Sequence, residues 1–195
     1  MTTSNNLSII GVAGTFGSGK DTLAEYLLEQ KNYFHVSTGD LVREESEKRH
    51  NSTERNPYLQ ETATYLRRTF GGDILIKKGL ERFEQLQQSK TYHGVVFTGL
   101  RSLGEAKGIK QAGGQLIFVD APVEIRYKRM QDRKRDNEIN MSLEGFKASE
   151  ANEQTQSDDD AEFNIYRIKD EADDTIMNDD TLETFIKRAE KALTL

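Results

Sequence analysis

The segment Gly14–Thr22 reads GTFGSGKDT and contains residue types suited to binding phosphate groups. It matches the spacing G-x-x-x-x-G-K, in which glycines let backbone N–H groups close around phosphates and a lysine, here Lys20, reaches the β and γ oxygens. The pattern usually continues with Ser or Thr, which holds Mg²⁺, but here Asp21 follows the lysine and the hydroxyl arrives at Thr22. We therefore expect a phosphate cradle formed by Gly14, Phe16, Gly17, Ser18, Gly19, Lys20, Asp21 and Thr22.

The elements around this segment are those that such a cradle requires. Leu7–Gly14 is a continuous apolar run closed by glycine, which predicts a strand buried on both faces of a parallel sheet. Asp21–Lys31 carries apolar residues at helical spacing, so the chain is expected to run from strand to glycine loop to helix. Further strands are expected at 33–40, 94–99, 115–121 and 174–178. Helices are expected at 39–49, 57–72, 73–87, 102–113, 122–135, 142–154 and 181–193. This alternation predicts an α/β fold of three layers, with a five-stranded parallel sheet between two layers of helices.

Length and composition exclude several classes of protein. A chain of 195 residues fits one domain, so 1–195 is expected to fold as a single unit. A formal net charge of −6 argues against sequence-independent binding to nucleic acid or to an anionic membrane. The absence of cysteine from the sequence excludes disulfides, thiolate catalysis and thiolate-bound metals. The first residues resemble neither a signal peptide nor a membrane span, so a cytoplasmic protein is expected.

Beyond the glycine loop, the chain resembles the nucleoside monophosphate kinases of the P-loop superfamily. VSTGDLVRE, residues 36–44, is similar to a segment of adenylate kinases whose threonine and arginine contact the acceptor nucleotide. The resemblance implies that Thr38 and Arg43 face the acceptor and that Asp40 lies near the Mg²⁺ shell. Helix capping explains Ser37, Thr38 or Asp40 equally well, but it leaves Arg43 without a role.

FTGLRS, residues 97–102, stands where the same kinases carry a strand that ends in DGFPR. By this resemblance Arg101 binds the acceptor phosphate, whereas Thr98 replaces the aspartate that orders the waters of Mg²⁺. Asp21 then moves a carboxylate into the loop and keeps the number of carboxylates near the metal unchanged. Asp21 and Asp40 are the metal residues expected on this basis, both through water.

The segment RYKRMQDRKR places Arg126, Arg129 and Arg133 on one face of a helix, and it resembles the lid arginines of adenylate kinases. Phosphoryl transfer depends on positioning and on positive charge around the transferring group, so Arg129 and Arg133 are expected to act there. A solvated basic face is the alternative. The polar, acidic stretch that follows predicts a lid-like insert at about 134–162, and the helices at about 38–90 are expected to bind the acceptor.

The end of the chain, ADDTIMNDDTLETF, resembles the adenine-binding strand of dephospho-coenzyme A kinases. By that resemblance Asn178 contacts the base, and a turn-forming asparagine is the alternative. The resemblance implies a kinase with a P-loop kinase fold and a lid, which uses ATP and Mg²⁺ and transfers the γ-phosphoryl group to a nucleoside monophosphate. Lys20, Asp40, Arg101, Arg129 and Arg133 are the catalytic residues expected. A dephospho-coenzyme A kinase, a deoxynucleotide acceptor and an ATP-binding regulator remain alternatives, and a monomer or small homo-oligomer is expected.

Overall fold

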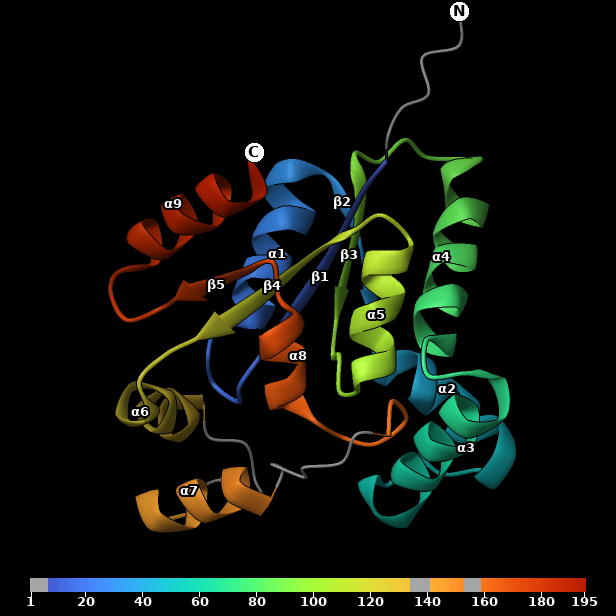
Figure 1. Ribbon diagram of the computed structural model, residues 1–195, viewed down its shortest axis with the longest axis horizontal. Helices are drawn as coiled ribbons and strands as arrows, with labels where there is room; N and C mark the ends of the chain where they lie inside the picture. Colours follow the sequence, from blue (N-terminus) through green and yellow to red (C-terminus); the bar gives the residue numbers. More distant parts are fainter. Residues whose placement is uncertain (1–6, 134–140, 153–158) are drawn as a thin grey trace, which may run out of the picture.

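The computed structural model describes residues 7–133, 141–152 and 159–195. In these residues the strands form one parallel sheet of five, in the order β2-β3-β1-β4-β5 (Figure 1). The central strand β1 pairs with β3 on one side and β4 on the other, so the glycine loop that follows it emerges from the middle of the sheet. The strands are β1 (Ser8–Gly14), β2 (Tyr33–Ser37), β3 (Gly94–Thr98), β4 (Gln115–Asp120) and β5 (Asp174–Met177). The five-stranded parallel sheet predicted from the sequence is thereby confirmed.

Helices cover both faces of this sheet because successive side chains of a strand point to opposite faces. Ile10 and Val12 of β1 pack in one buried cluster with α1 and α9, while Ala13 packs in a second cluster with α2, α3, α4, α5 and α8. Figure 1 shows these helices flanking the sheet, so the predicted three-layer α/β fold is confirmed. The helices are α1 (Lys20–Lys31), α2 (Thr38–His50), α3 (Gln60–Phe70), α4 (Ile74–Gln87), α5 (Leu103–Gln111), α6 (Val123–Arg133), α7 (Leu143–Asn152), α8 (Ile165–Glu171) and α9 (Leu182–Leu193). A π-helical turn at Arg55–Leu59 leads into α3.

Several predicted boundaries change for local reasons. The strand expected at 33–40 ends at Ser37, because the Ser37 side chain accepts a hydrogen bond from the Asp40 amide and caps α2. The helix expected at 122–135 spans α6, and its last two positions lie outside the described residues. The helix expected at 142–154 corresponds to α7, and its last two positions lie outside the described residues. The helix α8 was not predicted.

The predicted lid-like insert at 134–162 is only partly described. Positions 134–140 and 153–158 lie outside the described residues, so the structure places α7 and the short segment 159–162. No helix in the described part of the chain is both long and apolar enough to cross a membrane.

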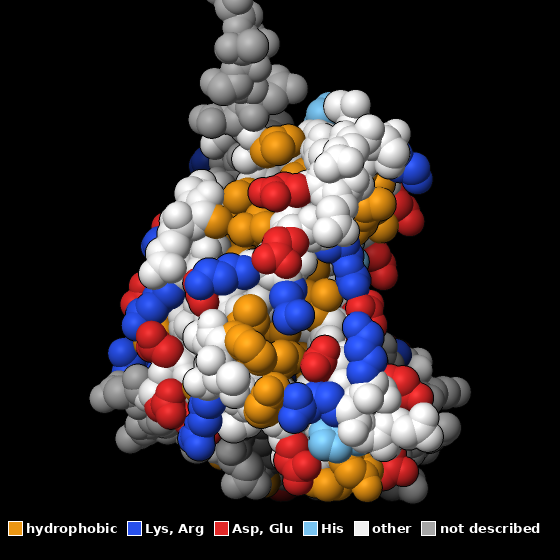
Figure 2. Space-filling model, turned by 90° about the vertical axis from the view of Figure 1, so that its right-hand side faces the viewer, with side chains coloured by type: hydrophobic (Ala, Val, Ile, Leu, Met, Phe, Trp, Pro, Cys, Tyr) orange, Lys and Arg blue, Asp and Glu red, His pale blue; other side chains and the backbone are white. Residues whose placement is uncertain are grey.

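The face that carries α3 and α4 has a mixed surface. Figure 2 shows Lys and Arg side chains interspersed there with Asp and Glu and with small apolar areas. Exposed ion pairs account for part of this pattern, such as Arg82 with Glu44 between α4 and α2. The described residues of this face therefore present no unbroken basic surface of the kind that binds nucleic acid backbones.

Candidate functional site

The glycine-rich segment forms a tight loop between β1 and α1, at the carboxyl edge of the sheet. Gly17 and Gly19 have φ angles of 76° and 99°, in the left-handed region that favours glycine. A Cβ atom on Gly17 would lie 2.8 Å from the carbonyl oxygen of Arg126, and one on Gly19 would lie 2.2 Å from Nδ2 of Asn178. Both positions therefore require glycine for its backbone conformation and for its lack of a side chain.

This loop is arranged to receive an anion. Gly19 is the N-cap of α1 and provides no side chain for the amides of the first turn, which are left to bind something else. Ser18 is fully buried, and its Oγ has no hydrogen-bond partner among the described residues. Such a hydroxyl is rare, because it has lost water without gaining a partner. An unpaired hydroxyl beside uncapped helix amides fits the phosphates of ATP.

Lys20, the lysine of the loop pattern, lies among other cations. Its side chain is 14% exposed, and its Nζ lies 3.7 Å from the carboxylate of Asp21. Burial lowers the pKa of Lys20, Asp21 opposes this shift, and the positive charges of Arg101 and Arg133 add to it. These cations come from α1, from the loop after β3 and from α6. A bound polyanion would offset their mutual repulsion, so their grouping suits phosphate groups.

The two predicted metal residues lie on the β2–β3 side of the loop. The Asp21 side chain is 62% exposed. Thr98, at the end of β3, forms a hydrogen bond of 2.8 Å between its Oγ1 and Nε2 of His35. Burial lowers the pKa of His35, and the negative charges of Asp40 and Asp21 oppose this shift. The two carboxylates are therefore close enough to His35, the partner of Thr98, to affect it electrostatically. His35 shows no metal-ligand spacing in the sequence and was assigned no role there, and its contact with Thr98 on the neighbouring strand is visible only in the fold.

In the described part of the chain, no three His, Asp or Glu side chains form a preformed metal site. Mg²⁺ in nucleotide enzymes is usually held by phosphates, by waters and by one or two carboxylates. The pair of Asp21 and Asp40 is compatible with that mode of binding.

Of the predicted acceptor residues, Thr38 and Arg101 lie at the loop after β3, whereas Arg43 contacts Asp40 on α2. Thr38 is buried, and its Oγ1 donates a hydrogen bond of 2.7 Å to the carbonyl oxygen of Gly99. Arg43 forms an ion pair with Asp40 in which both side chains are more than half exposed. The guanidinium of Arg101 lies 5.1 Å from the ring centroid of Phe163. The hydroxyl of Thr38 therefore joins α2 to the loop that carries Arg101.

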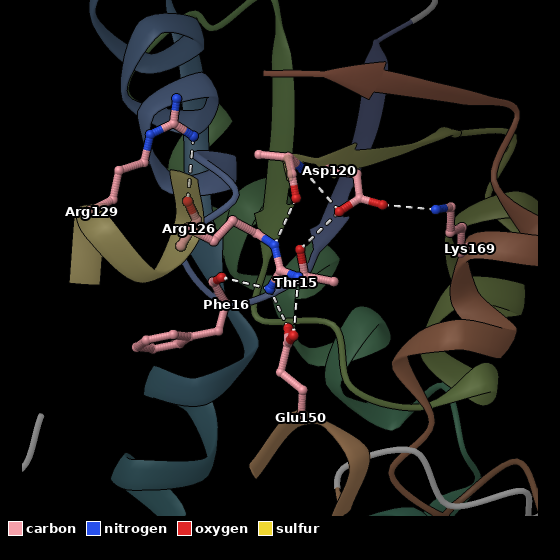
Figure 3. Close-up of polar contacts among 9 residues, drawn as sticks. Thr15, Phe16, Asp120, Arg126, Arg129, Glu150 and Lys169 are labelled. Atoms are coloured by element: carbon pink, nitrogen blue, oxygen red, sulfur yellow. Dashed lines mark hydrogen bonds and ion pairs between the residues drawn. The ribbon is translucent and has the colours of Figure 1, made fainter. Parts of the chain in front are cut away.

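Arg126 connects the glycine loop to α6 and α7 (Figure 3). Its guanidinium is buried and donates hydrogen bonds to the carbonyl oxygens of Ala121, at 2.8 Å, and Phe16, at 3.3 Å. It also forms an ion pair with Glu150 of α7 through both terminal nitrogens. Arg126 thus holds the backbone of the loop, and Glu150, which was not singled out from the sequence, neutralises its charge.

Arg129 lies beneath the glycine loop and contacts its backbone. Its guanidinium lies 3.4 Å from the carbonyl oxygen of Ser18, and it donates 3.1 Å hydrogen bonds to the backbone and side-chain oxygens of Asn178. Asn178 in turn donates from Nδ2 to the carbonyl oxygen of Ser18 at 2.8 Å. Burial lowers the pKa of Arg129. The guanidinium of Arg133 lies 4.7 Å from the ring centroid of Phe16.

These contacts bring the predicted residues of α6 and Asn178 to the loop. Arg129 and Asn178 contact backbone atoms there, so in this arrangement both support the loop that a ligand would enter. Their predicted roles, at the transferring group for Arg129 and at the base for Asn178, remain predictions.

Asp120, at the end of β4, is a further residue beside the glycine loop that was not identified from the sequence. It accepts a 3.2 Å hydrogen bond from Oγ1 of Thr15, and it forms a 2.8 Å ion pair with Lys169 of α8 (Figure 3). The available signal was an acidic residue at the carboxyl end of a buried strand, where open α/β sheets bind ligands. Its link to Lys169 spans 49 positions and cannot be read from local spacing.

Comparison with known proteins shows the family and the fold to which the chain belongs. The model of a family described as an AAA domain matches residues 10–158. The UPF0200 protein of Pyrobaculum aerophilum is 32% identical over 134 residues, which cover 68% of this chain and 70% of the relative. That of Sulfurisphaera tokodaii is 29% identical over 188 residues and 96% of each chain. The UPF0200/UPF0201 protein of Archaeoglobus fulgidus is 29% identical over 96% of this chain but only 55% of the relative, so this chain spans about half of that relative's length.

Two solved structures share the fold. The protein TT1252 from Thermus thermophilus aligns with a TM-score of 0.60 and 22% identity over 96% of both chains. The shikimate kinase from Bacteroides thetaiotaomicron aligns with a TM-score of 0.55 and 13% identity over 96% of this chain and 99% of its own. The chain therefore belongs to the AAA domain family and, among named relatives, to the UPF0200 proteins, and its fold is that of the P-loop kinases.

Proposed function

We propose that this protein is an ATP-dependent kinase that transfers the γ-phosphoryl group to a nucleoside monophosphate. The observation that carries the proposal is the grouping of three cations at the glycine loop. Arg101 lines a small pocket together with residues 14–16 of the loop, and the guanidinium of Arg133 lies 4.7 Å from the ring centroid of Phe16. The positive charges of both arginines help to lower the pKa of Lys20, the third cation. A protein that only binds ATP needs the loop and its lysine. The additional arginine after β3 suits a second phosphate group, which an acceptor nucleotide would bring.

The transfer proposed here joins an oxygen of the acceptor phosphate to the γ-phosphorus and breaks the bond to the β–γ bridging oxygen, so that ADP leaves. The first-turn amides of α1, Lys20 and Thr22 hold the donor phosphates. Arg43 and Arg101 orient the acceptor phosphate, and Arg133 places positive charge near the transferring group. An acceptor phosphate is already ionised near neutral pH, so the reaction requires no strong general base.

Mg²⁺, when bound with ATP, neutralises charge on the β and γ oxygens. Asp21 and Asp40 are the residues proposed to hold its waters. If the acceptor is instead a ribose hydroxyl, as in a dephospho-coenzyme A kinase, a base must take the proton, and Asp40 is the residue proposed for it.

The proposed domain is a single unit in which α2, α3 and α4 bind the acceptor and the insert that contains α7 covers the donor side. Two observations support this division. The loop that carries Arg101 is joined to α2 by the hydrogen bond from Thr38 to Gly99. On the other side, α7 is joined to the glycine loop through Glu150 and Arg126.

The first test is the release of ADP from ATP and Mg²⁺ in the presence of AMP, CMP, deoxynucleoside monophosphates or dephospho-coenzyme A. We expect stimulation by at least one nucleoside monophosphate. Lys20→Met serves as the negative control, because it removes the cation of the loop without adding a buried polar group.

Each outcome of this test has a definite meaning. Stimulation by dephospho-coenzyme A alone would move the proposal to a hydroxyl acceptor. Slow ADP release that no acceptor stimulates would overturn the kinase assignment and favour a nucleotide-binding regulator.

A further inference from the structure

Glu105, in the first turn of α5, is a fully buried carboxylate to which the proposed reaction gives no role. Its Oε1 accepts two hydrogen bonds from Arg67, one from Nε at 3.0 Å and one from Nη2 at 2.8 Å. Its Oε2 accepts hydrogen bonds from the backbone amides of Arg101, at 2.6 Å, and Ser102, at 3.4 Å. A buried carboxylate is tolerated only when it is paired and hydrogen-bonded, and here each oxygen has two donors.

The partners of Glu105 come from two regions that the proposed reaction must bring together. Arg67 belongs to α3, in the region proposed to bind the acceptor, and only 7% of it is exposed. The two backbone amides belong to the loop after β3 that carries the Arg101 side chain. The Glu105 carboxylate therefore joins an acceptor-binding helix to the backbone of the residue proposed to bind the acceptor phosphate.

The same loop is fixed from its other side. The carbonyl oxygen of Arg101 accepts a 2.8 Å hydrogen bond from the amide of Asn164, and Ser102 forms an antiparallel bridge with Phe163. Glu105 thus contacts the peptide groups on both sides of the Arg101 Cα, and Asn164 holds the second of them through its carbonyl oxygen. Of these contacts, the one with Glu105 also connects the loop to α3, through the ion pair of Glu105 with Arg67.

We propose that Glu105 is a positioning residue for phosphoryl transfer, which fixes the backbone of Arg101 and links it to α3 through Arg67. The inference rests on the proposed function. A purely structural ion pair would affect the stability of the protein alone, whereas this proposal predicts that loss of the pair weakens binding of the acceptor in particular. A displacement of about 1 Å at a positioned group can reduce a rate on the order of 100-fold, so loss of this anchor should be measurable.

The test compares the Michaelis constants of the acceptor and of ATP in wild type and in Glu105→Gln, using the acceptor that gives the greatest stimulation. The glutamine keeps the size of the side chain, but its NH₂ group cannot accept a hydrogen bond and must face either Arg67 or the two amides. We expect the KM of the acceptor to rise about tenfold while the KM of ATP stays within about twofold. An equal rise of both constants, or unchanged constants with less active protein, would overturn the proposal.

Two variants serve if Glu105→Gln fails to fold. Arg67→Lys keeps the charge that neutralises Glu105 but supplies a single ammonium in place of two guanidinium donors. We expect Arg67→Lys to raise the KM of the acceptor by a smaller factor than Glu105→Gln does, and again to leave the KM of ATP within about twofold of wild type. Lys110→Met is the control, because Lys110 of α5 also forms an ion pair, with Asp173, but an exposed one outside the region proposed to bind the acceptor. A selective rise in Lys110→Met equal to that in Arg67→Lys would overturn the proposal.

Amide hydrogen exchange separates failure of this inference from failure of the proposed function. We expect exchange of the peptide that contains the Arg101 and Ser102 amides to be faster in Glu105→Gln or Arg67→Lys than in wild type and Lys110→Met. Wild type without acceptor-stimulated turnover would disprove the proposed function alone. Unchanged exchange in the variants would disprove the anchoring by Glu105, whatever the enzyme does.

Discussion

At the scale of single residues, Asp21 is the clearest departure from the phosphate-loop pattern. Its carboxylate lies 3.7 Å from Nζ of Lys20 and is 62% exposed, so it can contact both the loop lysine and solvent. At the end of β3, Thr98 is bound to His35 and provides no carboxylate. The electrostatic effect of Asp21 on His35 indicates that the loop carboxylate acts on that same region. These contacts support the hypothesis that Asp21 replaces the missing metal-side aspartate.

The variant Asp21→Asn tests this hypothesis. Loss of an exposed charge that acts through water should raise the Mg²⁺ concentration for half-maximal turnover by about tenfold, or about 1.4 kcal/mol. Saturating Mg²⁺ should restore most of the rate. Glu25→Gln is the matched control, because Glu25 is an exposed acid one turn further along α1 that also acts on His35. An unchanged Mg²⁺ requirement in Asp21→Asn, or an equal change in Glu25→Gln, would contradict the relocation.

At the scale of elements, α7 is docked on the glycine loop rather than extended into solvent. Phe146 of α7 is 2% exposed, and its ring centroid lies 6.0 Å from that of Phe16 and 5.9 Å from that of Tyr127. The ion pair of Glu150 with Arg126 adds a polar contact between the same elements. Because Phe16 and Arg126 also shape the loop, docking of α7 and binding of the donor should be coupled.

We expect Phe146→Ala to release α7 and to weaken ATP binding. Removal of a buried phenylalanine ring costs about 3–5 kcal/mol in a protein core, and here the loss falls on one short helix. Limited proteolysis should therefore cut within the insert faster than in wild type, and titration with ATP should give a higher Kd. Phe70→Ala is the control, since the Phe70 side chain is 53% exposed. The coupling is wrong if Phe146→Ala accelerates proteolysis without changing the Kd for ATP.

At the scale of the whole molecule, the loops that carry the site all leave the carboxyl edge of the sheet. The glycine loop follows β1, the Arg101 loop follows β3, and Asp120 ends β4. These strands are neighbours in the sheet, so ligand binding at their ends should stabilise the central part of the fold. A ligand that binds only the folded state raises its stability by mass action.

MgATP should therefore protect the whole domain against thermal unfolding. At a concentration about 100 times its Kd, the expected stabilisation is about 2.7 kcal/mol. For a domain of this size each kcal/mol raises the Tm by about 2–4 °C, so a shift of about 5–11 °C is expected in scanning calorimetry. Lys20→Met should lose most of this shift. No shift of the wild type at millimolar MgATP would contradict donor binding in the loop.

The sequence by itself determined the layers of the fold and the place of the phosphate loop. Buried parallel strands such as β1 are continuous apolar runs, and amphipathic helices such as α9 have a repeating apolar face, so both can be recognised locally. The glycine pattern after β1 was readable for the same reason. The short helix α8, of seven residues, was missed because two turns carry too little periodicity to stand out.

The tertiary structure alone decided which side chains meet at the site. Arg126 and Arg129 were recognised as a basic helical face, but their contacts depend on how α6 lies against the glycine loop that follows β1 and against Asn178, which follows β5. Glu105 joins Arg67, which lies 38 positions away, and Asp120 joins Lys169 across 49 positions. Local spacing specifies secondary structure because neighbouring residues share one backbone geometry. Pairs so distant in sequence meet only after the sheet and its helices have packed, so the sequence pattern predicted the loop and the folded structure supplied its supports.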